Sequence, residues 1–304
     1  AGFDFSGFIN LKSLSCDRSL LVAQLNSVEF NAIPQASIEV LNLSGRVVGM
    51  DFTNFNFSGF TKLKILNLSK ARGLSAEQFN AIPQNVKASI ESIYLDYVNC
   101  TGFDFSGLIN LKILNLSLSR GLTAAQFNAI PQEVKASISF LDLSLVNVAG
   151  FNFSEFTGLK TLKLDVVQGL TATQFNVIPQ EVKGSIESLN LSYVDVTGFD
   201  FSGFTNLKIL KLARDLDSAD FNAIPQDVKG SIETLNLRNV DVTGFDFSGF
   251  TKLKILKLNS SPNLTAALFT HIREKIEFSI EVFALRDVNV KDFDFSGFSF
   301  LYLI

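Results

Sequence analysis

The sequence predicts an α/β solenoid, in which similar coils stack along one axis and each coil adds strands to a parallel sheet. Three observations predict this fold. The segment that opens at Phe103 reopens 48 residues later at Phe151 and again at Phe199. Each period contains the pattern L-x-x-L-x-L twice, and a helix-start signal followed by F-N-A-I-P lies between the two occurrences. A fixed period of roughly 20–50 residues is typical of arrays whose units pack only on their neighbours.

Two strands per period are expected from this pattern, for example at residues 111–116 (LKILNL) and 138–143 (ISFLDL). Side chains on a strand alternate between its two faces. Leu114 and Leu116 are therefore expected to point into the core, and the residues between and after them face outward on the concave side. The outward residues of this strand are Ile113, Asn115 and Ser117.

A short helix is expected after the first strand of each period. Thr123 and Gln126 form a capping-box pattern, in which the Thr oxygen and the Gln side chain bond to free backbone N–H groups at a helix start. Phe127 and Ile130 then fall on the inner face of that helix. Pro131 is expected to end it, because proline disfavours helical geometry at the preceding residue and has no N–H.

The second half of each period has no helical spacing and is expected to be an extended segment that backs the sheet. Phe151, Phe153 and Phe156 alternate with polar residues, so we expect their rings to stack from coil to coil as core and not to line a ligand site. The Asp of the F-D-F motif lies alone between two rings. This placement favours a solvated or backbone-bonded carboxylate over a calcium ligand. The residues are Asp4, Asp104, Asp200, Asp246 and Asp294.

The twelve L-x-x-L-x-L strands, with their alternating long and short spacing, resemble the leucine-rich repeat family over essentially the whole chain. The resemblance implies a curved parallel sheet on the concave face, with alternating short helices and extended phenylalanine-rich segments on the convex face. It implies a single solenoid over residues 1–304, built from about six 48-residue double repeats with partial units at both ends.

The long halves resemble the cysteine-containing subtype of F-box proteins, with Ser119 in place of the usual Cys, and the short halves resemble an irregular short type. Val146 replaces the Asn that in the family bonds neighbouring turns, which puts that asparagine ladder in question.

Several irregularities interrupt the repeat. In the sixth period F-T-H-I-R replaces F-N-A-I-P, so the proline is missing. Cys16 and Cys100 occupy inward positions in different periods, and both are predicted to be buried free thiols.

The first and last units are incomplete, with Phe3 in a backing segment and Leu303 in a strand. Unpaired edges invite pairing with another chain, so a structural or self-assembling protein that stacks head-to-tail through its termini is the alternative function.

Composition and motifs exclude several function classes. The net charge of −4 argues against a nucleic-acid binder, and no apolar run of roughly 18 residues predicts membrane insertion. With one histidine, His271, and no phosphate loop or metal-ligand spacing, we predict no catalytic residue, no metal site, no cofactor and no enzyme activity.

Sequons on the sheet, such as Asn67 and Asn115, indicate a chain that is not exposed to eukaryotic N-glycosylation. If Ala1 is a processed N-terminus, the expected location is extracellular or on the cell surface of a bacterium, or another non-glycosylating context.

The second strand position alternates in charge from strand to strand. It is Lys in every long half and Glu in five of six short halves, with Ser139 as the exception. Neighbouring strands lie ~4.8 Å apart, so the two rows are expected to form one ladder of ion pairs that fixes the strand register. Its members are Lys12, Glu39, Lys64, Glu91, Lys112, Lys160, Glu187, Lys208, Glu233, Lys254 and Glu281.

Positions are counted from the first residue of each L-x-x-L-x-L pattern, so that Leu111 is the first and Leu118 the eighth. The eighth position differs most between the copies and provides the candidate binding site. Five adjacent strands carry apolar or aromatic residues there, flanked by Lys70 and Arg214. Such a patch on a solenoid is typical of a protein-binding scaffold, so a non-enzymatic scaffold with a protein partner is the expected function. Two interpretations stay open: the row is exposed on the rim, or it tucks under the ascending loop and helps to bury Leu122. With two outward neighbours, the candidate residues are Tyr94, Tyr97, Leu118, Phe140, Leu145, Val166 and Tyr193.

Overall fold

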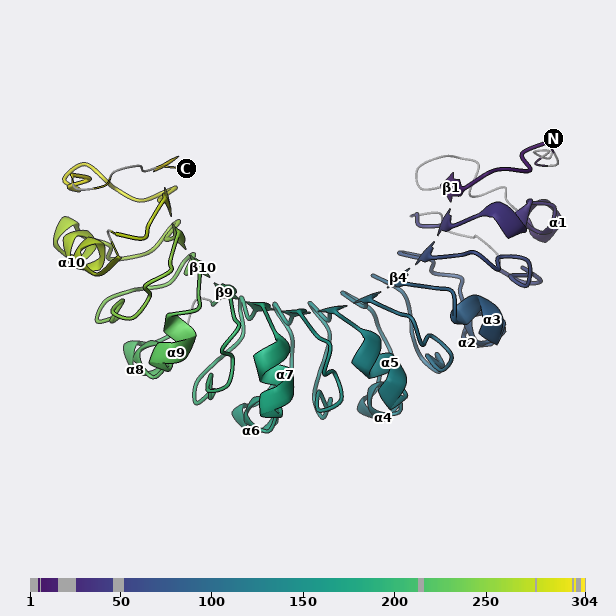
Figure 1. Cartoon of the computed structure of the whole chain (residues 1–304), viewed down its shortest axis with the longest axis horizontal. Coiled ribbons are helices and arrows are strands. Elements are labelled where there is room, and N and C mark those ends of the chain that lie inside the picture. The colour runs from purple at the N-terminus through teal and green to yellow at the C-terminus, as the bar shows by residue number, and fades with distance from the viewer. Residues whose placement is uncertain are drawn as a thin grey trace. The chain divides into compact units, whose positions relative to one another are not determined.

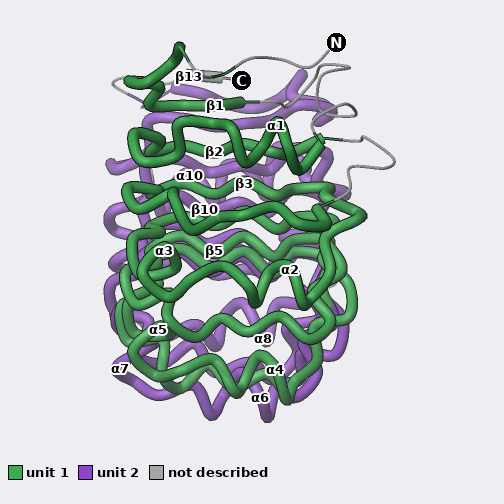
Figure 2. Tube along the Cα trace, turned by 90° about the vertical axis from the view of Figure 1, so that its right-hand side faces the viewer, with its two compact units in different colours: residues 1–146, 151–159 green, residues 147–150, 160–304 purple. Residues whose placement is uncertain are grey.

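The computed structural model describes residue 5 and residues 7–15, 26–45, 52–212, 216–276, 278–296, 298 and 302–303. The chain divides into two compact units, which Figure 2 colours separately. Unit 1 comprises residues 1–146 and 151–159, and unit 2 comprises residues 147–150 and 160–304.

In the described part of unit 1, six short strands pair in parallel and in chain order. They are β1 (Ser13–Ser15), β2 (Val40–Asn42), β3 (Ile65–Asn67), β4 (Ser92–Tyr94), β5 (Ile113–Asn115) and β6 (Phe140–Asp142). The helices are α1 (Ser27–Asn31), α2 (Ala76–Asn80), α3 (Gln84–Lys87), α4 (Ala124–Asn128) and α5 (Gln132–Ser137), with a 3-10 turn at Gln35–Ser37.

Unit 2 repeats this arrangement, and its described residues form seven parallel strands. They are β7 (Thr161–Lys163), β8 (Ser188–Asn190), β9 (Ile209–Lys211), β10 (Thr234–Asn236), β11 (Ile255–Lys257), β12 (Val282–Ala284) and β13 (Tyr302–Leu303). The helices are α6 (Ala172–Asn176), α7 (Gln180–Ser185), α8 (Ser218–Asn222), α9 (Gln226–Lys229) and α10 (Ala266–Ile276).

Within each unit the strands line the concave side of its curve, and the helices lie on the convex side (Figure 1). The strands pair in register, with Ile113 opposite Phe140 and Leu114 opposite Leu141. Leu114 and Leu116 are fully buried, as predicted, and Ile113 is half-buried on the other face. Parallel strands in this register, backed by short helices and extended segments, form the α/β architecture of a leucine-rich-repeat solenoid.

The proline of the F-N-A-I-P motif divides the helical part of each long half into two segments, where the sequence predicted one helix. α4 begins at the predicted capping box, in which Thr123 Oγ1 accepts a hydrogen bond from the Gln126 N–H at 3.3 Å. It ends before Pro131, as predicted, but Pro131 is also the N-cap residue of α5. In the sixth period, which lacks the proline, α10 continues for 11 residues. A proline is compatible with a helix start but not with a helix interior, which explains the difference.

Phenylalanine rings fill the space between the helices and the backing segments. Phe127 of α4 stacks on Phe151 with ring centroids 4.2 Å apart, and it also contacts Phe153 and Phe156. These rings are core, as predicted. The stacked pairs join a helix to the backing segment that follows it, which differs from the predicted column of backing rings alone. Equivalent clusters surround Phe30, Phe175, Phe221 and Phe269.

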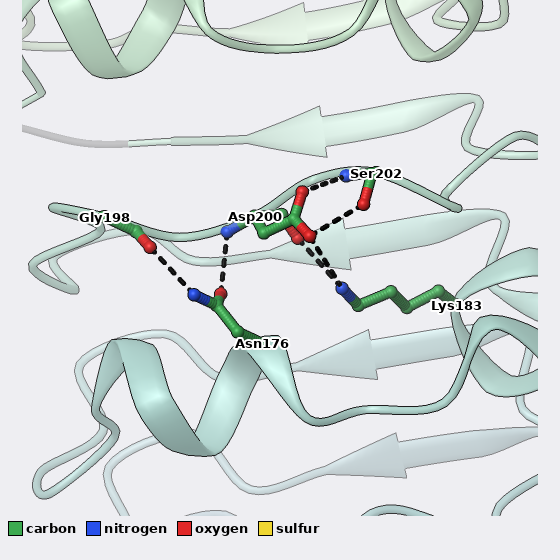
Figure 3. Close-up of polar contacts among 5 residues, drawn as sticks. All are labelled: Asn176, Lys183, Gly198, Asp200 and Ser202. Atoms are coloured by element: carbon green, nitrogen blue, oxygen red, sulfur yellow. Dashed lines mark hydrogen bonds and ion pairs between the residues drawn. The ribbon is translucent and has the colours of Figure 1, made fainter.

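Asparagines on the convex side link consecutive half-repeats. Val146 is buried, and the link is made instead by the Asn of F-N-A-I-P. Asn176 Oδ1 accepts a hydrogen bond from the Asp200 N–H at 2.7 Å, and Asn176 Nδ2 donates to the Gly198 carbonyl at 3.0 Å (Figure 3). The same pair of bonds is made by Asn31, Asn80 and Asn222.

Cys100 is a fully buried free cysteine, as predicted. Burial raises the pKa of its thiol to about 12, because the thiolate is poorly solvated there. Cys16 lies outside the described residues.

Candidate binding surface

The predicted binding residues lie in two groups, one in each unit. Unit 1 brings together five of them on and directly after the adjacent strands β4, β5 and β6: Tyr94, Tyr97, Leu118, Phe140 and Leu145. Unit 2 holds Val166 and Tyr193, which follow the adjacent strands β7 and β8.

In unit 1 the eighth-position residues are neighbours because they extend the backbone ladder of the sheet. The Tyr97 N–H donates to the Ser117 carbonyl at 3.1 Å, and the Leu118 N–H donates to the Ser144 carbonyl at 2.8 Å. Tyr97 is 48% exposed and Leu145 is 47% exposed, whereas Leu118 is half-buried. Tyr97 and Leu145 therefore lie at the surface of unit 1 and not under the loop.

Tyr94 and Phe140 enlarge this group from within the strands. Tyr94 is the last residue of β4 and Phe140 is the first residue of β6. Both side chains are half-buried on the outward face of the sheet. Lys70, the predicted flanking cation, lies with its Nζ 5.5 Å from the centre of the Tyr97 ring, within reach of a cation–π contact.

The pair in unit 2 has the same geometry. The Val166 N–H donates to the Ser192 carbonyl at 2.9 Å, so Val166 and Tyr193 follow neighbouring strands in register. Val166 is 37% exposed and Tyr193 is 55% exposed. Arg214, the other predicted flanking cation, lies outside the described residues.

The eighth position has a left-handed backbone, which the sequence patterns did not predict. The φ angle is 61° at Tyr97, 57° at Leu118, 62° at Leu145, 57° at Val166 and 61° at Tyr193. This conformation costs an L-residue roughly 1–2 kcal/mol, and it is least tolerable for a β-branched side chain. Five of the seven candidate residues are thus large apolar side chains at strained positions.

Ion pairs between neighbouring strands confirm much of the predicted charge ladder within each unit, but among the described residues Lys112 and Glu281 make no such pair. In unit 1, Lys64 Nζ lies 3.2 Å from a Glu91 carboxylate oxygen. In unit 2, Lys208 Nζ lies 2.8 Å from a carboxylate oxygen of Glu187 and lowers the pKa of that carboxyl, first through the hydrogen bond. The side chains are largely exposed, so each pair contributes only about 0.2–1 kcal/mol. Their main effect is to favour one register.

The sequence patterns did not predict a set of buried lysines on the convex side. Lys183 is 1% exposed, and its Nζ donates to the Asp200 carbonyl at 3.0 Å and lies 3.9 Å from the Asp200 carboxylate (Figure 3). The same Nζ lies 5.8 Å from the centre of the Phe175 ring. The equivalent buried lysines are Lys87, Lys135 and Lys229.

The copies within this chain contained the signal for these lysines. The sequence Q-x-V-K follows the proline in every period that holds one of them. Where Asn152 replaces the F-D-F aspartate, Glu155 supplies the carboxylate and lies 2.7 Å from Lys135 Nζ. In the last period, Arg273 Nη1 lies 2.8 Å from Asp294 Oδ2. A buried cation and a nearby carboxylate therefore occur together.

The charges in these clusters have perturbed pKa values. Burial lowers the pKa of Lys183, Lys87 and Lys229, and the nearby carboxylate opposes that effect. Asp200 accepts hydrogen bonds from the Ser202 hydroxyl and N–H, which lowers the pKa of its carboxyl. The described F-D-F aspartates, Asp104, Asp200, Asp246 and Asp294, are thus backbone-bonded, as predicted, and Asp4 lies outside the described residues. Because each ammonium group is buried and donates to a backbone carbonyl or a carboxylate, we interpret these clusters as structural.

Over the described residues, no group of three His, Cys, Asp or Glu side chains is placed to hold a metal ion. His271 is exposed on α10, as predicted. In the same part of the chain, no helix combines the length and the apolar character needed to cross a membrane.

No protein-family model matches the chain, and no curated protein matches it. Among solved structures, the chain is similar to the leucine-rich repeat-containing protein LegL7 from Legionella pneumophila. The sequence identity is 16%, the alignment covers 89% of this chain and 81% of that chain, and the TM-score is 0.40. The fold assignment rests on the strand register and the helix positions of this chain itself.

Proposed function

We propose that this protein is a non-enzymatic scaffold that binds a protein partner on its concave sheet face and rim. In unit 1 the contact group is Tyr94, Tyr97, Leu118, Phe140 and Leu145, and in unit 2 it is Val166 and Tyr193. The leucine-rich-repeat fold is commonly used for protein binding, because its sheet presents a broad surface on rigid elements.

The observation that carries the proposal is the presence of exposed apolar side chains at left-handed positions. Asn239 and Asp287 occupy the same position elsewhere in unit 2, at φ angles of 61° and 59°. Asn and Asp tolerate this conformation better than Leu, Val or Tyr does. Exposed Tyr97 and Leu145 add little to folding, whereas aromatic and aliphatic anchors contribute much of the free energy of an interface. Backbone strain of this kind clusters at functional sites.

The unit 1 group has dimensions suited to the centre of an interface. Three neighbouring strands at ~4.8 Å spacing place Tyr97 and Leu145 roughly 10 Å apart, with Leu118 between them. A small cluster of anchors within a larger, weakly contributing surface is typical of protein interfaces. Lys70 beside Tyr97 adds a charge at the edge of the cluster.

Site-specific photocrosslinking tests the proposal. A photoreactive amino acid replaces Tyr97 or, as a control, Val28, which is exposed on α1 of the same unit. In a native extract, we expect a crosslinked product from position 97 but not from position 28. Unlabelled protein should suppress this product, and the Tyr97→Ala/Leu145→Ala variant should not. Equal products from both positions, or equal competition by that variant, would contradict the proposal.

A further inference from the structure

Resting on the proposed scaffold function, we infer that the sheet face of unit 2 binds an acidic segment of a protein partner through a row of four cationic residues. The row lies on or directly after four adjacent strands, β9 to β12. Its members are Lys211, Arg238, Lys257 and Arg286.

The strand register brings these residues onto one face. Asn236 lies opposite Lys211 on one side and opposite Lys257 on the other. The two lysines are therefore two strand spacings apart, roughly 10 Å. Arg238 lies two residues beyond Asn236, past the end of β10 and roughly 7 Å farther along the chain. Because Leu237 between them is buried, Arg238 falls on the same face as Asn236. Arg286 takes the equivalent place after β12 and is exposed, as is Arg238.

The row carries charge that its own unit does not neutralise. The ladder lysines of unit 2 are ion-paired: Lys160 and Lys208 with Glu187, and Lys254 with Glu233. Among the residues described in unit 2, none of the four members of the row makes an ion pair. At the second, third, fifth, seventh and eighth positions of the repeats that contain β9–β12, the described residues include six cationic and three anionic side chains. The same positions of β2–β5 in unit 1 hold three of each, so the excess is specific to unit 2.

The surrounding charges favour an acidic polypeptide over a nucleic acid. The whole chain has a net charge of −4, so the row does not follow from a basic composition. Glu233 and Glu281 directly precede β10 and β12, the strands that Arg238 and Arg286 follow, and a continuous phosphate backbone would meet those carboxylates. A polypeptide can place individual carboxylates on the Arg and Lys groups and turn other side chains away. Arginine is suited to this role because its planar group binds a carboxylate through two hydrogen bonds.

Fluorescence anisotropy with the full chain tests the inference. The probe is a fluorescein-labelled peptide of alternating Glu and Ser, and a Lys–Ser peptide and an oligodeoxythymidine serve as comparison probes. The test variant is Arg238→Gln/Lys257→Gln. The matched control is Lys275→Gln/Lys291→Gln, which removes the same charge from exposed positions of the same unit outside the row.

We expect the acidic peptide to bind at low ionic strength and to bind more weakly as salt is added. The test variant should weaken binding about tenfold, and the control should change it less than about twofold. No binding of the acidic peptide, equal binding by the test variant, or tighter binding of the oligonucleotide would overturn the inference. Crosslinking from Tyr97 tests unit 1 independently. If the acidic peptide does not bind but the crosslink from Tyr97 still forms, the acidic partner is excluded and the scaffold function stands.

Discussion

At the scale of single residues, the eighth strand position determines how each coil leaves the sheet. At Tyr97, Leu118 and Val166 the N–H still bonds to the neighbouring coil while the φ angle is positive, so the side chain is held at the rim regardless of its chemical type. The sequence located this position through its variability. It did not reveal the backbone conformation, because only some copies, such as Asn239 and Asp287, carry residues typical of left-handed turns, and other copies carry Tyr, Leu or Val there.

Substitution of Val166 tests the strain directly. Val166→Asn should raise the free energy of unfolding by on the order of 1 kcal/mol, because Asn tolerates the left-handed conformation that strains a β-branched residue. Urea denaturation measures the change. Val177→Asn is the control, since Val177 is exposed with a φ angle of −81° and should change stability little. A less stable Val166→Asn variant would contradict the assignment of strain.

The buried thiol gives a second prediction at this scale. In a Cys16→Ser variant, Cys100 should react slowly with a thiol reagent in the native protein and rapidly in denaturant. The reason is that the thiol is buried and its pKa is raised to about 12, so the thiolate is scarce at neutral pH. The rate of reagent release measures both states. Rapid modification of the native protein would show that the assigned register is wrong.

At the scale of elements, the capping box, the inward leucines and the strand positions could be predicted, because each follows from local periodicity or from a short motif. The second helix of the long half could not be predicted in this way. It spans four to six residues and depends on Pro131 and its equivalents acting as helix starts. Burial of Lys183 depends on contacts with a segment 17 residues later in the chain, which no local pattern contains.

The F-D-F aspartates give a pH-dependent prediction. Their folded pKa values are lowered, first by the hydrogen bond from the side chain of the serine two residues later, so the folded state favours the ionised carboxylate. This contribution to stability is present at neutral pH and is lost as pH falls below the ordinary value of about 3.9 and through the folded pKa. The triple variant substitutes Asn at Asp104, Asp200 and Asp246, as the chain itself does at Asn152.

Urea denaturation of the wild type and the triple variant over a range of pH measures this effect. We expect the wild type to be more stable at neutral pH, and the difference to shrink in acid as the wild-type carboxylates become protonated. A difference that is constant with pH would show that the carboxylate charge does not contribute.

At the scale of the whole molecule, the charge and the apolar surface are distributed differently in the two units. The strands β4–β6 of unit 1 carry the larger apolar group, whereas β9–β12 of unit 2 carry the unbalanced cations. Local sequence comparison found the apolar group but not the cationic row, because the row depends on fifth and seventh positions of different strands. A single solenoid over residues 1–304, the repeat subtypes and head-to-tail association stay predictions.

The most direct test of the scaffold function is the affinity of the crosslinked partner, once purified, for three forms of the protein. Isothermal titration calorimetry compares the wild type, the Tyr97→Ala/Leu145→Ala variant and the Val28→Ala control. We expect the double variant to lose on the order of 2 kcal/mol of binding free energy or more, while its unfolding free energy stays near that of the wild type and the control binds normally. Unchanged affinity of the double variant, or a large loss of stability without loss of binding, would contradict a binding role for this surface.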